Sequence, residues 1–211
     1  MNLRGKFITF EGSEGSGKST QIERLVGRLQ DSGLPTLLTR EPGGTDLGEE
    51  IRNLLLHHRA GGDMVPEAEL LLFAAARAQL VRERIVPALK EGKVVISDRF
   101  LDSTTVYQGA ARRLAPEAVT RINHFAVGHH VPDLTFVLDV PVEVSRERVR
   151  SRGAGRPDRI ESESHEFFHR VREGYLALAR SDARRVAIVD STLPVDEVAS
   201  LIWKTVHERL A

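Results

Sequence analysis

Short runs of consecutive apolar residues alternate along the chain with longer segments in which apolar residues recur every three or four positions. Five short runs have the length and apolar content typical of β-strands. They lie at Phe7–Phe10, Thr36–Thr39, Val94–Ile96, Leu134–Leu138 and Val186–Val189. Because these runs are continuous rather than alternating, we expect the strands to be buried on both faces of a sheet.

The longer segments predict helices between the strands. Pro87 lies inside the longest of them, and we expect a kink or break near it because proline removes a helical hydrogen bond. Strands separated by helices need crossover connections, so the sequence predicts an α/β fold in three layers, a five-stranded parallel sheet with helices on both faces. The helical patterns cover Lys18 to about Asp31, a stretch from about Leu47, Pro66 to about Glu91, 116–128, 142–151, 163–181 and a stretch from about Val195.

Length and composition limit the classes of protein to which the chain can belong. Its 211 residues, 41% of them hydrophobic, suit a single domain spanning 1–211. Lys and Arg together number 30, as do Asp and Glu together, so the formal net charge is zero. The whole chain therefore has no net attraction for nucleic acid or an anionic membrane. The sequence contains no cysteine, which excludes disulfides and thiolate metal sites. With no long apolar run and no signal-peptide pattern, we expect a cytoplasmic protein without nucleic-acid or membrane partners.

The segment after the first predicted strand carries a specific chemical signal. Gly12-x-x-x-x-Gly17-Lys18-Ser19 matches the P-loop pattern and lies between a strand and a helix, as that motif requires. Glycines let backbone N–H groups surround a phosphate, Lys18 can reach the terminal phosphates, and the Ser19 hydroxyl can bind Mg²⁺. The sequence therefore predicts a nucleoside triphosphate and Mg²⁺ bound by Gly12, Ser13, Glu14, Gly15, Ser16, Gly17, Lys18, Ser19 and Thr20.

A P-loop by itself does not separate a kinase from a GTPase switch or an ATPase motor. The GTPase hypothesis needs an Asn-Lys-x-Asp motif late in the chain, and the sequence has none. A motor is usually larger and carries an apolar strand that ends in Asp-Glu. The kinase hypothesis therefore fits best, and a nucleotide-binding module without turnover stays open.

A second pair of charged residues, Asp98 and Arg99, follows the third predicted strand. Ligands of open α/β sheets bind beyond the carboxyl ends of the strands, so this pair is placed for binding. Asp98 can hold Mg²⁺ through water, and Arg99 can bind a phosphate with two parallel N–H groups. A helix cap beside a surface arginine is the alternative interpretation.

Four longer segments resemble the thymidylate kinase family, in its order and spacing. They are Thr39–Thr45, Leu71–Gln79, Ile96–Gly109 and Asp158–Glu161. The resemblance implies transfer of the γ-phosphoryl group of ATP to dTMP, giving dTDP, by a homodimer with a P-loop kinase fold and a short lid near 150–162. A nucleoside kinase or another nucleoside monophosphate kinase is the alternative within the same class.

The resemblance also implies roles for individual residues. Phe73 would stack on the thymine ring, and Arg77, one helical turn later, would donate to a base carbonyl. Arg52 and Arg99 would hold the dTMP phosphate, and Tyr107 would lie against the deoxyribose. The remaining substrate contacts that the resemblance implies are Glu14, Glu41, Thr104 and Gln108.

Phosphoryl transfer needs cations around the transferring group. Members of the family carry a catalytic arginine either in the P-loop or in the lid, and positions 13–16 contain none. The resemblance therefore assigns the role to Arg152, with Arg148 and Arg156 as alternatives, beside Lys18 and Arg99. It also suggests the loop at Asp190–Thr192 for the adenine.

The eight histidines include two adjacent pairs, His57–His58 and His129–His130. Adjacent residues do not share a helix face, and no carboxylate spacing nearby suggests a set of metal ligands. We expect the histidines to be surface or interface residues.

Overall fold

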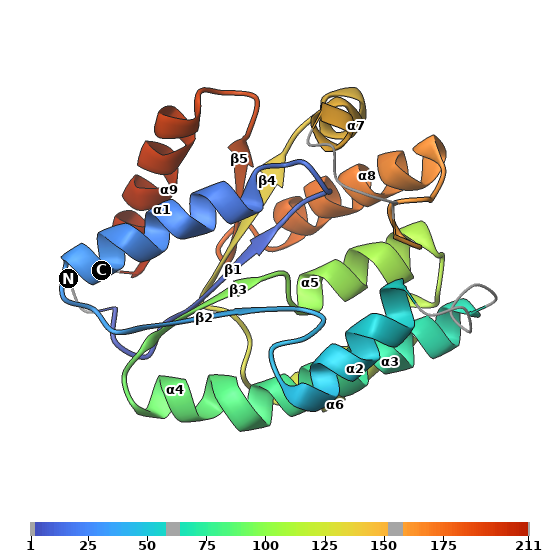
Figure 1. Cartoon of the computed structure of the whole chain (residues 1–211), viewed down its shortest axis with the longest axis horizontal. Coiled ribbons are helices and arrows are strands. Elements are labelled where there is room, and N and C mark those ends of the chain that lie inside the picture. Colours follow the sequence, from blue (N-terminus) through green and yellow to red (C-terminus); the bar gives the residue numbers. More distant parts are fainter. Residues whose placement is uncertain (1–2, 58–63, 152–157, 211) are drawn as a thin grey trace.

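The structure is a computed structural model that describes residues 3–57, 64–151 and 158–210. All five predicted strands are present and pair in parallel, in the order β2-β3-β1-β4-β5 (Figure 1). This confirms the predicted α/β fold with a five-stranded parallel sheet. The strands are β1 (Phe7–Glu11), β2 (Thr36–Arg40), β3 (Val94–Asp98), β4 (Leu134–Asp139) and β5 (Val186–Asp190).

The segments between the strands are helical, and two of these helices, α2 and α8, begin at a capping side chain. The Thr45 hydroxyl accepts the Gly48 N–H at 3.0 Å at the start of α2, and the Ser164 hydroxyl accepts the Phe167 N–H at 3.1 Å at the start of α8. The helices are α1 (Lys18–Asp31), α2 (Asp46–Leu56), α3 (Pro66–Leu80), α4 (Val86–Lys90), α5 (Leu101–Thr104), α6 (Pro116–Val127), α7 (Val142–Ser151), α8 (His165–Ser181) and α9 (Val195–Leu210), with π-helical segments η2 (Val81–Ile85) and η3 (Thr105–Ala111).

Helices cover both faces of the sheet, which gives the three predicted layers (Figure 1). Helices α1 and α9 pack on one face, where Ile22, Leu25 and Ile202 meet Ile8 and Phe136. The other face is covered by two groups of helices, one around α3, η2, α4 and α6 and one around η3 and α8. Within the ranges given above, no helix has the length and apolarity needed to cross a bilayer.

The sheet order places a topological switch at β1. On one side the chain crosses from β1 to the edge strand β2 and returns to β3, which lies next to β1, and it then continues to β4 and β5 on the other side. The carboxyl ends of β1, β2 and β3 therefore lie along one edge of the sheet, where ligands of doubly wound folds bind. Glu11, Arg40 and Asp98 are the last residues of these three strands.

The two outer strands differ from the sequence expectation of burial on both faces. Leu38 on β2 is 50% exposed and Ile188 on β5 is 46% exposed, whereas β1 and β4 are almost entirely buried. The reason is that edge strands lie at the rim of the sheet, where the flanking helices cover them only in part. An apolar run in an α/β protein therefore does not distinguish an edge strand from a central one.

Two helical features were not specified by the sequence analysis. The helix that begins at Pro66 continues to Lys90, and instead of breaking at Pro87 it passes through the π-helical turn η2, which widens the backbone just before the proline. The segment Leu101–Ala111 is helical, as α5 and η3, although we identified it only as a motif.

Candidate active site

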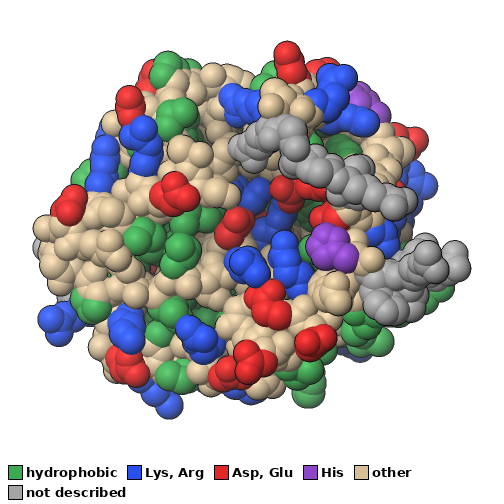
Figure 2. Space-filling model, viewed as in Figure 1, with side chains coloured by type: hydrophobic (Ala, Val, Ile, Leu, Met, Phe, Trp, Pro, Cys, Tyr) green, Lys and Arg blue, Asp and Glu red, His purple; other side chains and the backbone are tan. Residues whose placement is uncertain are grey.

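Two adjoining cavities open at the carboxyl edge of the sheet. Figure 2 shows acidic and basic side chains gathered around a hollow on this face. The first cavity, of about 510 Å³, lies on the phosphate loop, and the second, of about 540 Å³, lies beside it over α3, α5 and η3. Four side chains line both cavities, and they come from the loops after β1, β2 and β3 and from α2: Glu14, Glu41, Arg52 and Arg99.

The phosphate loop adopts a conformation that depends on glycine. Gly12 has a φ of 133°, and a side chain there would come within 2.7 Å of the Leu138 carbonyl. Gly17 has a φ of 90° and caps α1 from the left-handed region, which glycine enters without steric cost. The Lys18 ammonium folds back to donate to the Gly12 and Ser13 carbonyls at 3.2 and 3.0 Å. The loop therefore presents a cation and a helix N-terminus to the first cavity.

Side chains behind the phosphate loop fix its position. The Ser145 hydroxyl on α7 donates to the Glu14 carbonyl at 2.6 Å, and the Ser191 hydroxyl donates to the Ser16 carbonyl at 2.6 Å. The Arg148 guanidinium donates to the carbonyls of Gly15 at 3.4 Å and Ser191 at 3.0 Å. Arg148 thus connects the phosphate loop to the loop after β5. The other two candidate arginines, Arg152 and Arg156, lie outside the described residues.

The expected metal ligands lie on one wall of the first cavity. Ser19 and Asp98 both line it. The Oδ1 atom of Asp98 is buried and has no hydrogen-bond partner in the described part of the chain, which leaves an oxygen available beside Lys18. A carboxylate and a hydroxyl are hard oxygen donors of the type that Mg²⁺ prefers. The residues present therefore fit a magnesium ion.

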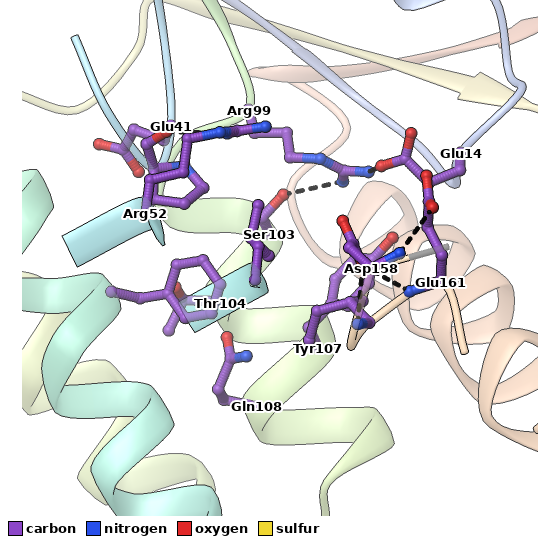
Figure 3. Close-up of a pocket in the computed structure, with 14 residues that line it drawn as sticks. Glu14, Glu41, Arg52, Arg99, Ser103, Thr104, Tyr107, Gln108, Asp158 and Glu161 are labelled. Carbon is purple, nitrogen blue, oxygen red and sulfur yellow. Dashed lines mark hydrogen bonds and ion pairs between the residues drawn. The ribbon is translucent and has the colours of Figure 1, made fainter. Parts of the chain in front are cut away.

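The second cavity brings together most of the predicted substrate contacts (Figure 3). Thr104, Tyr107 and Gln108 project from the helical segment after β3, and Phe73 lies on α3. Leu56 and Ile160 add apolar surface, so the cavity combines an aromatic ring and aliphatic groups with a few polar ones. This is the composition expected of a small-molecule site. The complete lining is Glu14, Glu41, Pro42, Arg52, Leu56, Phe73, Arg99, Ser103, Thr104, Tyr107, Gln108, Asp158, Ile160 and Glu161.

Arg99 stands at the junction of the two cavities. Its backbone has a positive φ of 69°, and its carbonyl accepts the Ser97 hydroxyl at 2.7 Å, so a strained residue is held in place by its neighbours. The guanidinium lies over the Tyr107 ring, 5.2 Å from the ring centroid, and donates to Glu14 at 2.5 Å. A cation is thus fixed between the phosphate loop and the second cavity.

The charges at the junction perturb each other strongly. Burial would raise the pKa of Glu14, but the cationic Lys18 and Arg99 outweigh it and lower that pKa to about 2. Burial alone would lower the pKa of Arg99, yet Tyr107 and Glu14 raise it well above the usual value. Both residues are therefore ionised at neutral pH, and perturbed groups that meet in a cavity are typical of functional sites.

Arg77 does not line the second cavity, although we expected it to contact a substrate there. It is 1% exposed and lies directly behind the cavity wall. Its guanidinium donates to Glu41 at 2.7 Å, to Asn123 at 2.9 Å and to Thr104 at 3.0 Å. Two of these acceptors, Glu41 and Thr104, themselves line the cavity. The predicted contact between Arg77 and a base stays a prediction, and the observed role of Arg77 is to hold the wall in place.

Two buried polar atoms on the cavity wall have no hydrogen-bond partner among the residues that the structure describes. They are the Tyr107 hydroxyl and the Oε1 atom of Glu41. An unpaired buried polar group is costly, so such atoms in a cavity point to a bound polar ligand. Burial also raises the pKa of Tyr107 to about 12 and that of Glu41 to about 7, against the opposing charges of Arg99 and Arg77 respectively.

Several residues of the candidate site were given no role in the sequence analysis. Ser103, Asp158 and Glu161 line the second cavity, and all three belong to motifs that we quoted without assigning them a role. Glu11 lies beneath the junction, where its carboxylate accepts the Phe100 N–H at 2.8 Å and the Tyr175 hydroxyl at 2.8 Å. Its position as the last residue of a buried strand was the signal that could have identified it.

A phosphate loop after the first strand of a parallel sheet, joined through a fixed arginine to a second polar and aromatic cavity, defines a P-loop phosphotransferase. Comparison with known proteins narrows this class. A family model described as thymidylate kinase matches residues 10–202. The chain belongs to the thymidylate kinase family.

The most similar proteins include thymidylate kinases from several organisms. The chain is 47% identical to that of Bradyrhizobium sp. strain BTAi1, over 98% of this chain and 92% of the relative. It is 48% identical to that of Kosmotoga olearia, over 94% and 93% of the two chains. It is 50% identical to that of Thermomicrobium roseum, over 96% and 94%. The segment matched by the family model contains all the residues that line the two cavities.

Proposed function

We propose that this protein transfers the γ-phosphoryl group of ATP to dTMP, giving dTDP and ADP. The observation that carries the proposal is the pair of adjoining cavities joined by Arg99. One cavity has a phosphate loop for a triphosphate, and the other can take a nucleoside monophosphate. Family membership supports thymine as the base. The family and this pairing both favour the kinase over a nucleotide-binding module without turnover.

ATP would bind on the phosphate loop, with its phosphates against residues Gly12–Thr20. The free α1 N-terminus and the Lys18 ammonium would bind the β- and γ-phosphates. Ser19 and Asp98 would hold Mg²⁺, which would supply positive charge to offset the charge of the phosphates. The adenine would lie toward the loop after β5, where Arg148 connects Ser191 to the phosphate loop.

The dTMP would occupy the second cavity with its phosphate toward the first. Arg52 and Arg99 line both cavities and would bind that phosphate. Phe73 would stack on the thymine ring, and the buried Thr104 and Gln108 would lie near its edge. Tyr107 and the carboxylates of Glu14 and Glu41 would contact the sugar. The Tyr107 hydroxyl has no hydrogen-bond partner in the part of the chain that the structure describes, which supports this placement.

The chemistry requires charge neutralisation more than it requires a base, because the acceptor is already an anion. Arg99 is ion-paired with Glu14, so it is oriented before the acceptor binds. Lys18, which lines the first cavity, would add a second positive charge beside the transferring group. We propose Arg152 as the third cation, with Arg156 and Arg148 as alternatives, and a lid near 150–162 that excludes water during transfer.

We further propose that the chain forms one domain over residues 1–211 and assembles as a homodimer. Three large apolar side chains are exposed on helices that pack side by side on one flank of the molecule (Figure 1). They are Leu47 on α2, Leu71 on α3 and Phe125 on α6, at 52%, 57% and 83% exposure. Exposed apolar residues on adjacent elements are typical of an interaction surface. A cytoplasmic location stays a prediction.

The direct test offers purified protein several acceptors with Mg·ATP and measures ADP release. The acceptors are dTMP, dUMP, UMP, AMP, GMP, CMP and thymidine. We expect the highest kcat/KM with dTMP. Phosphorylation of thymidine alone, or no phosphorylation of any of these acceptors, would contradict the proposal.

A pair of lysine variants links that activity to the phosphate loop. Lys18→Ala removes the buried cation and should lower kcat roughly 100-fold or more, as loss of a group that stabilises transition-state charge does. Lys204→Ala removes an exposed lysine on α9 whose side chain is 71% exposed, and it should leave kcat unchanged. Equal kcat values for the two variants would show that the reaction does not take place at the phosphate loop.

A further inference from the structure

Two histidines and a carboxylate meet on the surface between α7 and α8, and none of the three lines either of the two cavities described above. Glu143 lies in the first turn of α7, and His165 and His169 lie at the start of α8. The Glu143 Oε1 atom is 3.3 Å from the His165 Nε2 atom and 3.7 Å from the His169 Nε2 atom. One ligand atom from each of the three residues lies within 4.8 Å of the other two.

The local sequence explains why the two imidazoles face the same way. His165-Glu166-Phe167-Phe168-His169 separates them by one helical turn, so both project from the same face of α8. Their ring centroids are 4.6 Å apart. The Ser164 cap fixes the beginning of the helix, and Phe167 and Phe168 anchor its other side in the core. The two ligands are therefore held on a rigid element.

This cluster differs from our expectation that the histidines form no metal-ligand set. That expectation followed from the adjacent pairs His57–His58 and His129–His130. The ligands here are separated by one turn in a His-x-x-x-His arrangement, and the carboxylate comes from a different helix. Only the packing of α7 against α8 brings the carboxylate to the two rings.

The donor set has the chemistry and spacing of a zinc site. Ligand atoms at 2.0–2.1 Å from a tetrahedral ion lie about 3.3 Å from one another, close to the observed separations of Glu143 from the two rings. Two imidazoles and one carboxylate suit Zn²⁺ and similar transition-metal ions, whereas Mg²⁺ prefers oxygen donors alone. The side chains of all three residues are about half exposed or more, so a water can complete the coordination.

We propose that Glu143, His165 and His169 form a binding site for Zn²⁺ or a similar transition-metal ion that ties α7 to α8. The site is for binding rather than hydrolysis. His-Glu-x-x-His helices of metalloproteases use the glutamate as a base. In this chain the glutamate at that position is Glu166. It is ion-paired with Arg170 at 2.6 Å and its side chain is 76% exposed, so it is not held in place to act as a base.

The ion would stabilise the helix that supports the phosphate loop. The Ser145 hydroxyl, two residues after Glu143 on α7, donates to the Glu14 carbonyl. The hollow beside the cluster has a volume of about 1260 Å³ and is lined by Glu14 as well as by Glu143 and His165. A metal ion at this position therefore fixes the spacing of α7 and α8 next to the reaction site.

Calorimetric titration of the untagged full chain with ZnCl₂ tests the proposal, without nucleotide and with excess MgCl₂ to occupy oxygen-donor sites. We expect one equivalent of Zn²⁺ to bind. The variant H165A/H169A should weaken that binding more than tenfold, because even indirect partners of metal ligands contribute about 10–100-fold to affinity. The matched variant H129A/H130A removes two histidines from the surface and should bind like the unchanged chain.

Thermal unfolding provides the second measurement and a check on folding. Without zinc, the unchanged chain and H165A/H169A should have similar Tm values, because the removed rings are exposed. With zinc, the Tm of the unchanged chain and of H129A/H130A should rise, while that of H165A/H169A should not. Zinc binding of equal affinity in H165A/H169A and the unchanged chain, or no binding to the unchanged chain, would overturn the proposal.

Discussion

At the scale of single residues, the second cavity depends on charges that are buried behind its wall. Glu41 is 5% exposed, and its carboxylate accepts a hydrogen bond from the Arg77 guanidinium, while its second oxygen has no partner among the described residues. Burial raises the pKa of Glu41 to about 7, although the charge of Arg77 opposes the rise. The carboxyl is therefore close to half-protonated at neutral pH, which lets it donate or accept a hydrogen bond.

The raised pKa of Glu41 predicts a pH-dependent stability. A carboxyl whose pKa is higher in the folded state than in the unfolded state stabilises the fold below about pH 4.5, and that stabilisation is lost as the pH rises to about 7. Glu41→Gln cannot titrate. We therefore expect the free energy of unfolding of the unchanged chain, relative to Glu41→Gln, to fall by about 3 kcal/mol or less between pH 5 and pH 8.

Urea unfolding at the two pH values measures this difference. Glu49→Gln is the matched control, since a backbone hydrogen bond from Gly44 lowers the pKa of Glu49 and its titration lies below this range. The free-energy difference for that variant should be the same at pH 5 and pH 8. Parallel pH profiles for Glu41→Gln and the unchanged chain would show that Glu41 is ionised throughout.

The motifs predicted most residues of the candidate site but not how they are supported. Glu14, Phe73 and Tyr107 line the second cavity, and all three lie in motifs of consecutive residues. Arg52 also lines it, and only the family resemblance implied its role. The surroundings of Arg77 were not predictable, because Glu41, Asn123 and Thr104 come from three distant segments. A motif identifies a side chain, whereas its hydrogen-bond partners depend on tertiary packing.

At the scale of elements, the packing of α8 against η3 positions two cavity residues. Tyr107 and Gln108 belong to η3, and Gly174 of α8 lies against the opposite side of that segment. A methyl group on Gly174 would come within 3.0 Å of Val106 and 3.1 Å of Ala110. Glycine is therefore needed at this position for close contact rather than for its backbone conformation.

Two glycine-to-alanine substitutions distinguish the effect of close packing on stability from the effect of helix propensity. In a helix, alanine is more favourable than glycine by about 1 kcal/mol. Gly27→Ala on α1 adds a methyl group with nothing within 4 Å, so we expect the free energy of unfolding to rise. Gly174→Ala should be less stable than Gly27→Ala by about 1–3 kcal/mol, because the added methyl group overpacks the contact with η3.

The same pair of variants tests whether η3 positions the cavity. Displacement of η3 should raise the KM for dTMP in Gly174→Ala and leave it unchanged in Gly27→Ala. Denaturant unfolding and steady-state kinetics measure the two effects. If Gly174→Ala gained stability and kept its KM, the close contact would have no role in positioning Tyr107 and Gln108.

Element order was predictable from the sequence because the periods of strands and helices differ clearly. Details that depend on neighbours were not. Leu38 has the same sequence character as buried strand residues, but β2 lies at the edge of the sheet. Pro87 predicted a local disturbance, and the π-helical turn η2 before it shows the form that this disturbance takes. The hydrophobic pattern contains no information on either outcome.

At the scale of the whole molecule, the two cavities and the exposed apolar flank share the same helices. Helix α2 carries Arg52 on its cavity side and Leu47 on its exposed side. Helix α3 likewise carries Phe73 on its cavity side and Leu71 on its exposed side. Association through the exposed flank would therefore support the helices that form one wall of the second cavity. This arrangement connects the proposed homodimer to the proposed site.

Light scattering of the purified chain tests the homodimer, and a single charge on the flank tests its location. Leu71→Glu places a carboxylate at a side chain that is 57% exposed, where it should cost the monomer little but oppose burial in an interface. We expect the unchanged chain to have the mass of a dimer and Leu71→Glu to shift toward the monomer. Leu201→Glu makes the same change at a 40% exposed leucine on α9 and should stay dimeric. A monomeric unchanged chain would contradict the dimer, and dimeric Leu71→Glu would move the interface to another face.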